Sequence, residues 1–194
     1  MSEKFFNGRY RIAPQRAQWH DYDNGTYFIT ICTHGREHFF GEIVKTNGKQ
    51  KMIPTPVGKY ADEQIRSVQT HYPYAEIPSW VVMPDHVHCI VIIHRDGIPF
   101  KKRNIRKNRN IRNGSSGHGS DGAGVPNQTQ TATLMQTWLS VVIRGIKYAV
   151  TRYARKNGIP FQWQTRFFDL IIRNDDDIKR VDNYIRYNVA NWCG

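Results

Sequence analysis

The chain of 194 residues is poor in cysteine and in acidic residues, and it has no long hydrophobic run. Its three cysteines, Cys32, Cys89 and Cys193, lie far apart and form no CxxC pair. The first two sit in apolar, strand-like runs that are typical of buried free thiols. No stretch approaches the roughly 20 apolar residues that cross a bilayer, and the first residues lack the apolar core of a signal peptide. We therefore expect a cytoplasmic protein with no membrane partner.

Positive charge is what the composition has in excess. Twenty-eight Lys and Arg residues stand against 16 Asp and Glu, which gives a net charge of +12. This imbalance favours a polyanionic partner, most often nucleic acid, although many small proteins have a basic solvated surface without one. With 39% hydrophobic and 12% aromatic residues, the chain has the composition of a globular protein.

The stretch from about residue 100 to residue 131 differs from the rest of the chain. It begins with seven basic residues and no acid among them: Lys101, Lys102, Arg103, Arg106, Lys107, Arg109 and Arg112. It then becomes rich in Gly, Ser and Asn and shows no apolar periodicity. We interpret residues 1–194 as a single domain that contains a mobile surface insertion at about 100–131.

The remaining sequence alternates between strand-like and helix-like patterns. We expect strands at 27–33, 38–44, 80–82 and 86–93, a turn at 45–50, an aromatic connector at 161–172, and helices at 57–71, 132–156 and from 174 to about 190. Antiparallel pairing of such strands leaves one face for the helices. The sequence therefore predicts an α+β, ferredoxin-like fold, with an antiparallel sheet and helices packed on one face.

His86-Val87-His88 leads directly into a β-branched run that ends at Ile93. Side chains alternate along a strand, so the two imidazoles point to the same face. Two imidazoles side by side on a strand form half of a metal site. The alternative is an ordinary pair of strand histidines whose nitrogens bond to backbone or water.

The last predicted helix contains Tyr184 and Asn188, four residues apart. Residues at i and i+4 are neighbours on a helix surface. If this helix docks on the sheet near the histidines, Asn188 becomes a third ligand and Tyr184 stands beside the metal. Such pairs also occur by chance in many helices. Tyr187 is a rival tyrosine, but its position next to Asn188 points it elsewhere.

Four segments together resemble one family. They are Tyr27–Arg36 followed by Phe40–Ile43, Trp80–His88, Trp163–Arg173 and Tyr184–Asn188. In this order they resemble the single-tyrosine HUH transposases of the insertion-sequence-200-like class, which include the REP-associated tyrosine transposases. HUH denotes the motif His, apolar residue, His. The resemblance covers roughly residues 20–192 apart from the insertion. One departure is Val189, since the family usually has proline after the asparagine.

The resemblance implies a function and a set of roles. The protein would cleave and rejoin single-stranded or hairpin DNA without ATP. Tyr184, on the C-terminal helix, would be the nucleophile and form a 5′-phosphotyrosine. His86, His88 and Asn188 would bind Mg²⁺ or Mn²⁺, although imidazole and amide ligands alone also suit zinc. Relatives include monomers and homodimers, and the sequence leaves both open.

Basic and aromatic residues are candidates for holding the DNA. The predicted phosphate contacts are Arg144, Lys147, Arg152, Arg166, Arg173, Arg186, Lys101, Lys102 and Arg103. Trp163, Phe167 and Phe168 could stack on unpaired bases, although aromatic residues in such a segment more often belong to the core.

Two other functions remain as alternatives. The first is a non-catalytic, domesticated relative that binds nucleic-acid hairpins, but retention of His86, His88, Tyr184 and Asn188 argues against it. The second is a metal-dependent phosphodiesterase or a histidine-triad nucleotide hydrolase. Such a triad needs a third alternating histidine, and position 90 is Ile.

Overall fold

The computed structural model describes residues 5–6, 9–10, 20–94 and 137–192. The predicted insertion at about 100–131, with Lys101, Lys102 and Arg103, lies outside these residues. Within them, no helix is both long and apolar enough to span a membrane.

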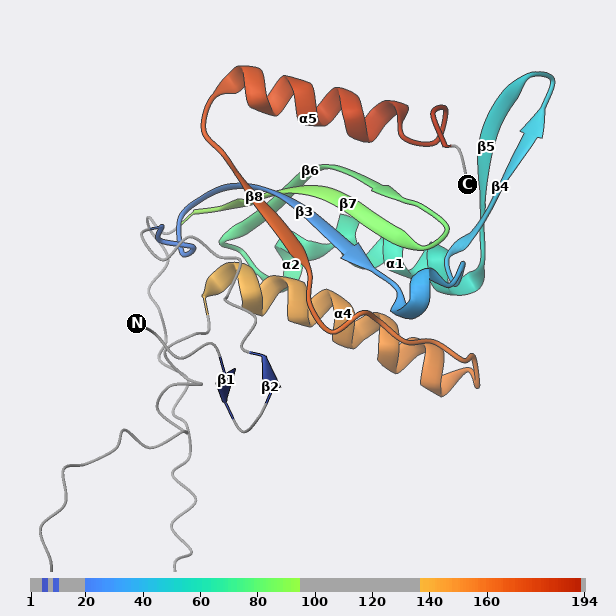
Figure 1. The fold of residues 1–194 in the computed structure, drawn as a ribbon, viewed down its shortest axis with the longest axis horizontal. Helices are drawn as coiled ribbons and strands as arrows, with labels where there is room; N and C mark the ends of the chain where they lie inside the picture. The colour runs from blue at the N-terminus through green and yellow to red at the C-terminus, as the bar shows by residue number, and fades with distance from the viewer. Residues whose placement is uncertain (1–4, 7–8, 11–19, 95–136, 193–194) are drawn as a thin grey trace, which may run out of the picture.

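A four-stranded antiparallel sheet in the order β6-β7-β3-β8 organises the fold (Figure 1). Its strands are β3 Gly25–Cys32, β6 Ala75–Val82, β7 His86–Ile93 and β8 Phe168–Ile172. One helical connection joins β3 to β6 and another joins β7 to β8, which is the βαββαβ arrangement of ferredoxin-like folds. The predicted α+β class and its antiparallel sheet are confirmed.

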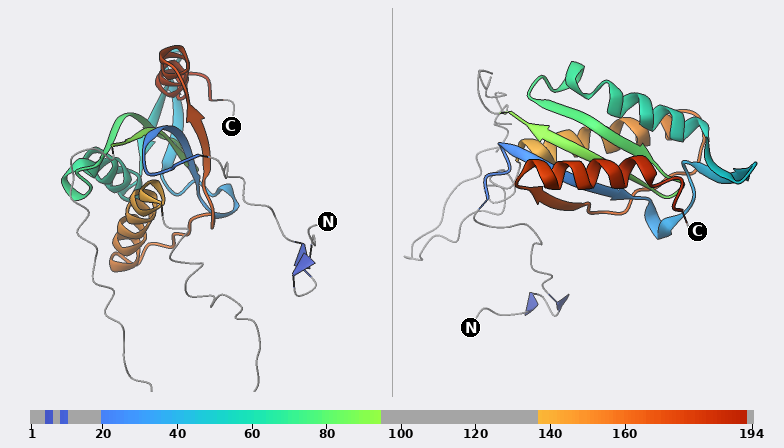
Figure 2. Two further views of the ribbon diagram at one scale, coloured as in Figure 1. Left: turned by 90° about the vertical axis from the view of Figure 1, so that its left-hand side faces the viewer. Right: turned by 90° about the horizontal axis from the view of Figure 1, so that it is seen from above.

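Helices cover both faces of this sheet. The first face carries α1 Pro56–Arg66, α2 Val68–His71 and α4 Trp138–Lys156, whereas the sequence predicted all of the helices on one face. The C-terminal helix α5, Asp175–Tyr187, lies alone on the opposite face (Figure 2). The reason is visible in β7, whose residues are buried on both faces. Cys89 and Val91 join the large core with α1 and α4, whereas Ile90 packs against Ile185 of α5.

Two elements were less visible in the sequence. The predicted strand at 38–44 and turn at 45–50 are part of a hairpin, β4 Gly41–Thr46 and β5 Lys49–Pro54, closed by Asn47 and Gly48 with φ of 51° and 76°. The predicted connector at 161–172 contains β8, a short edge strand with little alternation to reveal it. A 3-10 turn, η1 His34–Arg36, follows β3, and β1 Phe5–Phe6 pairs with β2 Arg9–Tyr10.

Side-chain caps determine where the helices begin. Thr55 Oγ1 accepts from the Gly58 N–H at the start of α1, and Thr137 Oγ1 accepts from the Ser140 N–H at the start of α4. Asn174 accepts from the Asp177 N–H at the start of α5, where three acidic residues also favour the helix dipole. The Asn174 cap sets where α5 begins, and α5 carries two of the side chains of the site described below.

Candidate active site

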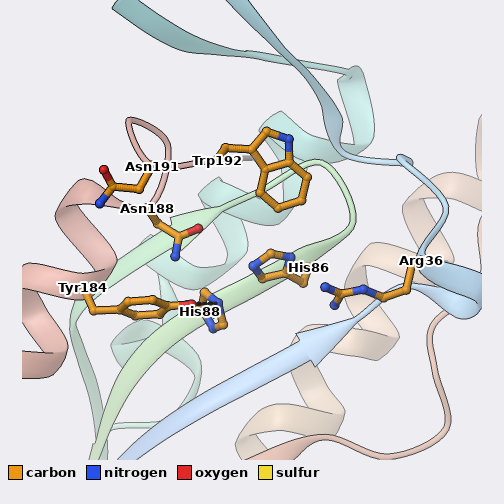
Figure 3. A pocket seen from close by; sticks show the side chains of 7 residues that line it. All are labelled: Arg36, His86, His88, Tyr184, Asn188, Asn191 and Trp192. Atoms are coloured by element: carbon orange, nitrogen blue, oxygen red, sulfur yellow. Dashed lines mark hydrogen bonds between the residues drawn. The ribbon is translucent and has the colours of Figure 1, made fainter. Parts of the chain in front are cut away.

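A cavity of about 290 Å³ lies between the C-terminal end of α5 and the sheet (Figure 3). The residues that line it are Arg36, His86, His88, Tyr184, Asn188, Asn191 and Trp192. The structure thus brings together the two histidines, the tyrosine and the asparagine that the sequence singled out, although α5 is about 90 residues further along the chain.

His86 and His88 occupy alternate positions at the start of β7 and share the face that α5 covers. Their ring centroids are 4.4 Å apart, and the side chains are almost fully buried. In the sheet they lie opposite Cys32 and Thr30 of β3. The strand period therefore places both rings at the floor of the cavity.

Each histidine is held through its Nδ1 atom. The Nδ1–H of His86 donates to Asp85 Oδ1 at 2.5 Å, and the buried Asp85 carboxylate also pairs with Nε of Arg36 at 2.8 Å. Nδ1 of His88 lies 2.9 Å from Oγ1 of Thr30. These contacts fit the tautomers in which each Nε2 presents a lone pair.

Burial keeps both rings neutral at physiological pH. It lowers the pKa of His88 to about 3, with smaller contributions from the neighbouring His86 and Arg36. Burial also lowers the pKa of His86, against the opposing hydrogen bond and charge of Asp85. Neutral imidazole is the form that binds metal ions.

Tyr184 projects from the last turn of α5, and Asn188 is the residue that caps the C-terminal end of this helix. The Tyr184 hydroxyl lies 3.2 Å from Nε2 of His88, and its ring packs edge-on against Phe28 at 5.9 Å. Half of the Tyr184 surface remains exposed, so a large substrate can reach it, whereas Asn188 is buried. Tyr187 does not line the cavity.

The chain after α5 forms the wall above His86. The Asn191 N–H donates to the Tyr187 carbonyl at 3.0 Å, so the backbone continues to turn beyond Val189. Gln50 of β5 donates to the Trp192 carbonyl at 2.9 Å. This contact helps to hold the Trp192 ring near His86, at a centroid distance of 5.9 Å.

Sequence reasoning missed the roles of three residues in this site. Asp85 was adjacent to the motif, but its pairing with Arg36 crosses from β7 to the turn after β3. An acidic residue directly before the histidine pair was the only available signal in the sequence. Trp192 gave none, because its position depends on β5.

The predicted phosphate contacts are dispersed over the surface. Arg144, Lys147 and Arg152 belong to α4, on the sheet face opposite the cavity. Lys147 donates to the Gln164 carbonyl at 2.6 Å, and burial lowers its pKa. Arg186 pairs with Asp182 on α5.

Arg166 precedes β8 and Arg173 follows it, so both lie near the ends of this edge strand. The three aromatic candidates differ in how deeply they are buried. Trp163 is buried and Phe167 packs against the core, whereas Phe168 is half exposed. Of the three, the structure leaves only Phe168 free to meet a base.

The donor set suits a metal ion better than acid–base catalysis by histidine. Two neutral imidazoles and the Asn188 amide face one cavity, and among the described residues no cluster of three or more His, Cys, Asp or Glu offers an alternative. Because burial lowers the pKa of His88 to about 3, its Nε2 atom is a weak proton acceptor. His88 is therefore a poor base for Tyr184.

Comparison with solved structures concerns the fold alone. The chain shares its fold with a solved REP-associated tyrosine transposase bound to a REP hairpin, at 20% identity and a TM-score of 0.51, over 90% of this chain and 72% of that one. A second structure, a candidate transposase from Deinococcus radiodurans, covers 91% of this chain and 99% of its own at 12% identity, but its TM-score of 0.38 carries no weight.

Comparison of the sequence with known proteins gives less information about function. No family model matches the chain. An uncharacterised protein of Haemophilus influenzae is 27% identical over 198 residues, which span 99% of this chain and 96% of that protein. This relative extends over nearly the whole chain but carries no functional description.

The lowered histidine pKa values predict acid sensitivity of the metal-free protein. Below pH 6.5 the unfolded state binds protons that the folded state excludes, so stability is full above pH 6.5 and falls as pH decreases toward 3. His88 alone should cost about 3 kcal/mol at pH 4.5. Urea unfolding in EDTA at pH 7.5 and 4.5 measures this, and His88→Gln should reduce the difference. Equal pH dependence in the two proteins would contradict the prediction.

Proposed function

We propose that the protein is a metal-dependent DNA transposase that nicks and rejoins single-stranded or hairpin DNA through a 5′-phosphotyrosine. The observation that supports this best is the position of the Tyr184 hydroxyl, 3.2 Å from His88 Nε2 in the cavity that His86 and Asn188 also line. The shared fold with a transposase that binds a REP hairpin supports the same substrate class.

The reaction is a transesterification at phosphorus. The Tyr184 oxygen attacks the scissile phosphate and loses its proton, while the bond from phosphorus to O3′ breaks and the departing oxygen takes up a proton. The downstream strand is left joined to Tyr184 through its 5′ phosphate, and the upstream strand ends in a 3′-OH. Attack by a 3′-OH on the phosphotyrosine reverses these steps, so no ATP is needed.

His86, His88 and Asn188 would hold the divalent cation, which we take to be Mg²⁺ or Mn²⁺ from the resemblance to HUH enzymes. When bound, the cation supplies Lewis-acid polarisation of the phosphate and favours the ionised phenol. Thr30 and Asp85 hold the two rings through their Nδ1 atoms, which would leave each Nε2 available to the cation. The exposed half of Tyr184 leaves the oxygen accessible to a strand from outside.

A covalent-adduct assay tests this proposal. Hairpin DNA with single-stranded flanks is labelled at either end and incubated with the protein and Mg²⁺ or Mn²⁺. We expect the 3′-labelled fragment to migrate with denatured protein, and the 5′-labelled fragment to be released with an extendable 3′-OH. The reverse labelling pattern would contradict the chemistry. Binding without any adduct would favour a non-catalytic hairpin-binding protein.

Asp85 should act as a positioning residue for His86. Asp85→Asn removes the charge that orients the Nδ1–H and pairs with Arg36, so Mn²⁺ affinity should fall about 10- to 100-fold. Calorimetric titration with Mn²⁺ measures this. The control is Asp62→Asn, since Asp62 is a partly exposed residue of α1 that accepts from Arg66 and Trp80 and does not line the cavity. Equal Mn²⁺ affinity in both variants would exclude the role.

A further inference from the structure

Helix α5 leaves part of its sheet face uncovered. It is tied to β6 by Ser79, which donates to Asp182 at 2.6 Å, and it reaches β3 through the Tyr184 contact with Phe28. The edge strand β8 lies beyond β3 (Figure 1). Its residues Phe168 and Leu170 point to the same face as the cavity and are 50% and 51% exposed.

These two side chains continue the surface of the candidate active site. One row across the sheet runs from His88 through Thr30 to Phe168, and two strand spacings separate its ends by about 10 Å. In the next row, Leu170 lies opposite Phe28, whose ring stacks beside His88 at 5.1 Å. We call Phe28, Phe168 and Leu170 the β8 platform.

The composition of the platform indicates what covers it. Neighbouring large apolar side chains on an open edge strand favour a partner. Cationic residues lie near both ends of β8, since Arg166 precedes the strand and Arg173 follows it, and Arg36, which pairs with Asp85, lines the adjoining cavity. Apolar rings with a basic rim suit nucleobases and their phosphates. A second copy of this chain would instead bring like charges together.

We propose that the β8 platform binds unpaired nucleobases of the DNA strand that leads to Tyr184, with Phe168 stacking on a base. This inference rests on the proposed function, which places the scissile phosphate at Tyr184, about 10 Å or less from the platform. It assigns the platform to single-stranded DNA and not to the duplex stem, because stacking needs an exposed base face.

The test separates binding from cleavage by using the full chain with Tyr184→Phe. Fluorescence anisotropy measures its affinity for a DNA hairpin with short randomised single-stranded tails and for the same hairpin without tails. Adding Phe168→Ala should weaken binding of the tailed hairpin about 5- to 150-fold and leave binding of the blunt hairpin unchanged. Phe168→Trp should restore the affinity for the tailed hairpin.

Tyr148→Ala is the matched control, since Tyr148 is an aromatic residue 65% exposed on α4, behind the sheet. Equal tailed-hairpin affinities for Phe168→Ala and the control, or no dependence on the tail, would overturn the inference. So would light scattering that shows a DNA-free dimer dissociated by Phe168→Ala. An intact tail effect without adduct formation by the unmodified protein would refute the proposed function alone.

Discussion

Replacing Tyr184 with Phe is expected to abolish covalent adduct formation while leaving the fold and DNA binding intact. The change removes one oxygen, the atom that would form the bond to phosphorus. Among the described residues that line the cavity, no other is a tyrosine. Loss of a covalent nucleophile typically reduces the rate by at least about 10⁴-fold. The measurement is the amount of 3′-labelled DNA that remains with protein on a denaturing gel.

Tyr187→Phe is the matched control for this experiment. Tyr187 is on the same helix and 61% exposed, but it does not line the cavity. Its variant should form adducts at the original rate. Adducts that persist in Tyr184→Phe and disappear in Tyr187→Phe would transfer the nucleophile assignment to Tyr187.

Replacement of both histidines by Ala should have the second largest effect. His86→Ala with His88→Ala removes two of the three proposed ligands, so adduct formation should fall about 10³-fold or more, and added Mn²⁺ should not restore it. EDTA should have the same effect on the unmodified protein, reversed by excess Mn²⁺. Adding EDTA to the double histidine variant should reduce adduct formation no further than either change alone, because both remove the same ion.

His94→Ala provides the comparison. His94 follows β7 directly, but it is exposed and pairs with Glu76 at the other end of the strand. Its loss should change neither Mn²⁺ binding nor adduct yield. Full activity of the double histidine variant in EDTA would show that the cleavage needs no metal held by these rings.

Local spacing made much of the candidate site predictable. The strand period places His86 and His88 on one face, and the helix period places Tyr184 and Asn188 together, and both arrangements are present in the structure. The order of strands and helices was enough for the ferredoxin-like fold. These features depend on residues within a few positions of one another, which a sequence displays directly.

Features that join distant segments were not predictable in this way. β8 is a short edge strand with exposed Phe168 and Leu170, so its pattern resembled an aromatic connector. The phosphate candidates on α4 were chosen for charge, but the sheet separates them from the cavity. The sequence also did not predict that a helix covers the second face of the sheet. The face on which a helix packs depends on the apolar surface that the whole protein buries.

The sequence by itself determined which side chains could act together within each element, because backbone periodicity fixes their spacing. Only the tertiary structure decided that α5 lies over β7, that Asp85 pairs with Arg36, that Trp192 lines the cavity and that the β8 platform lies on the same sheet face. Burial also gave His88 a pKa of about 3, which no local pattern encodes. Each depends on contacts between residues far apart in the chain, which form when both faces of the sheet bury their apolar side chains.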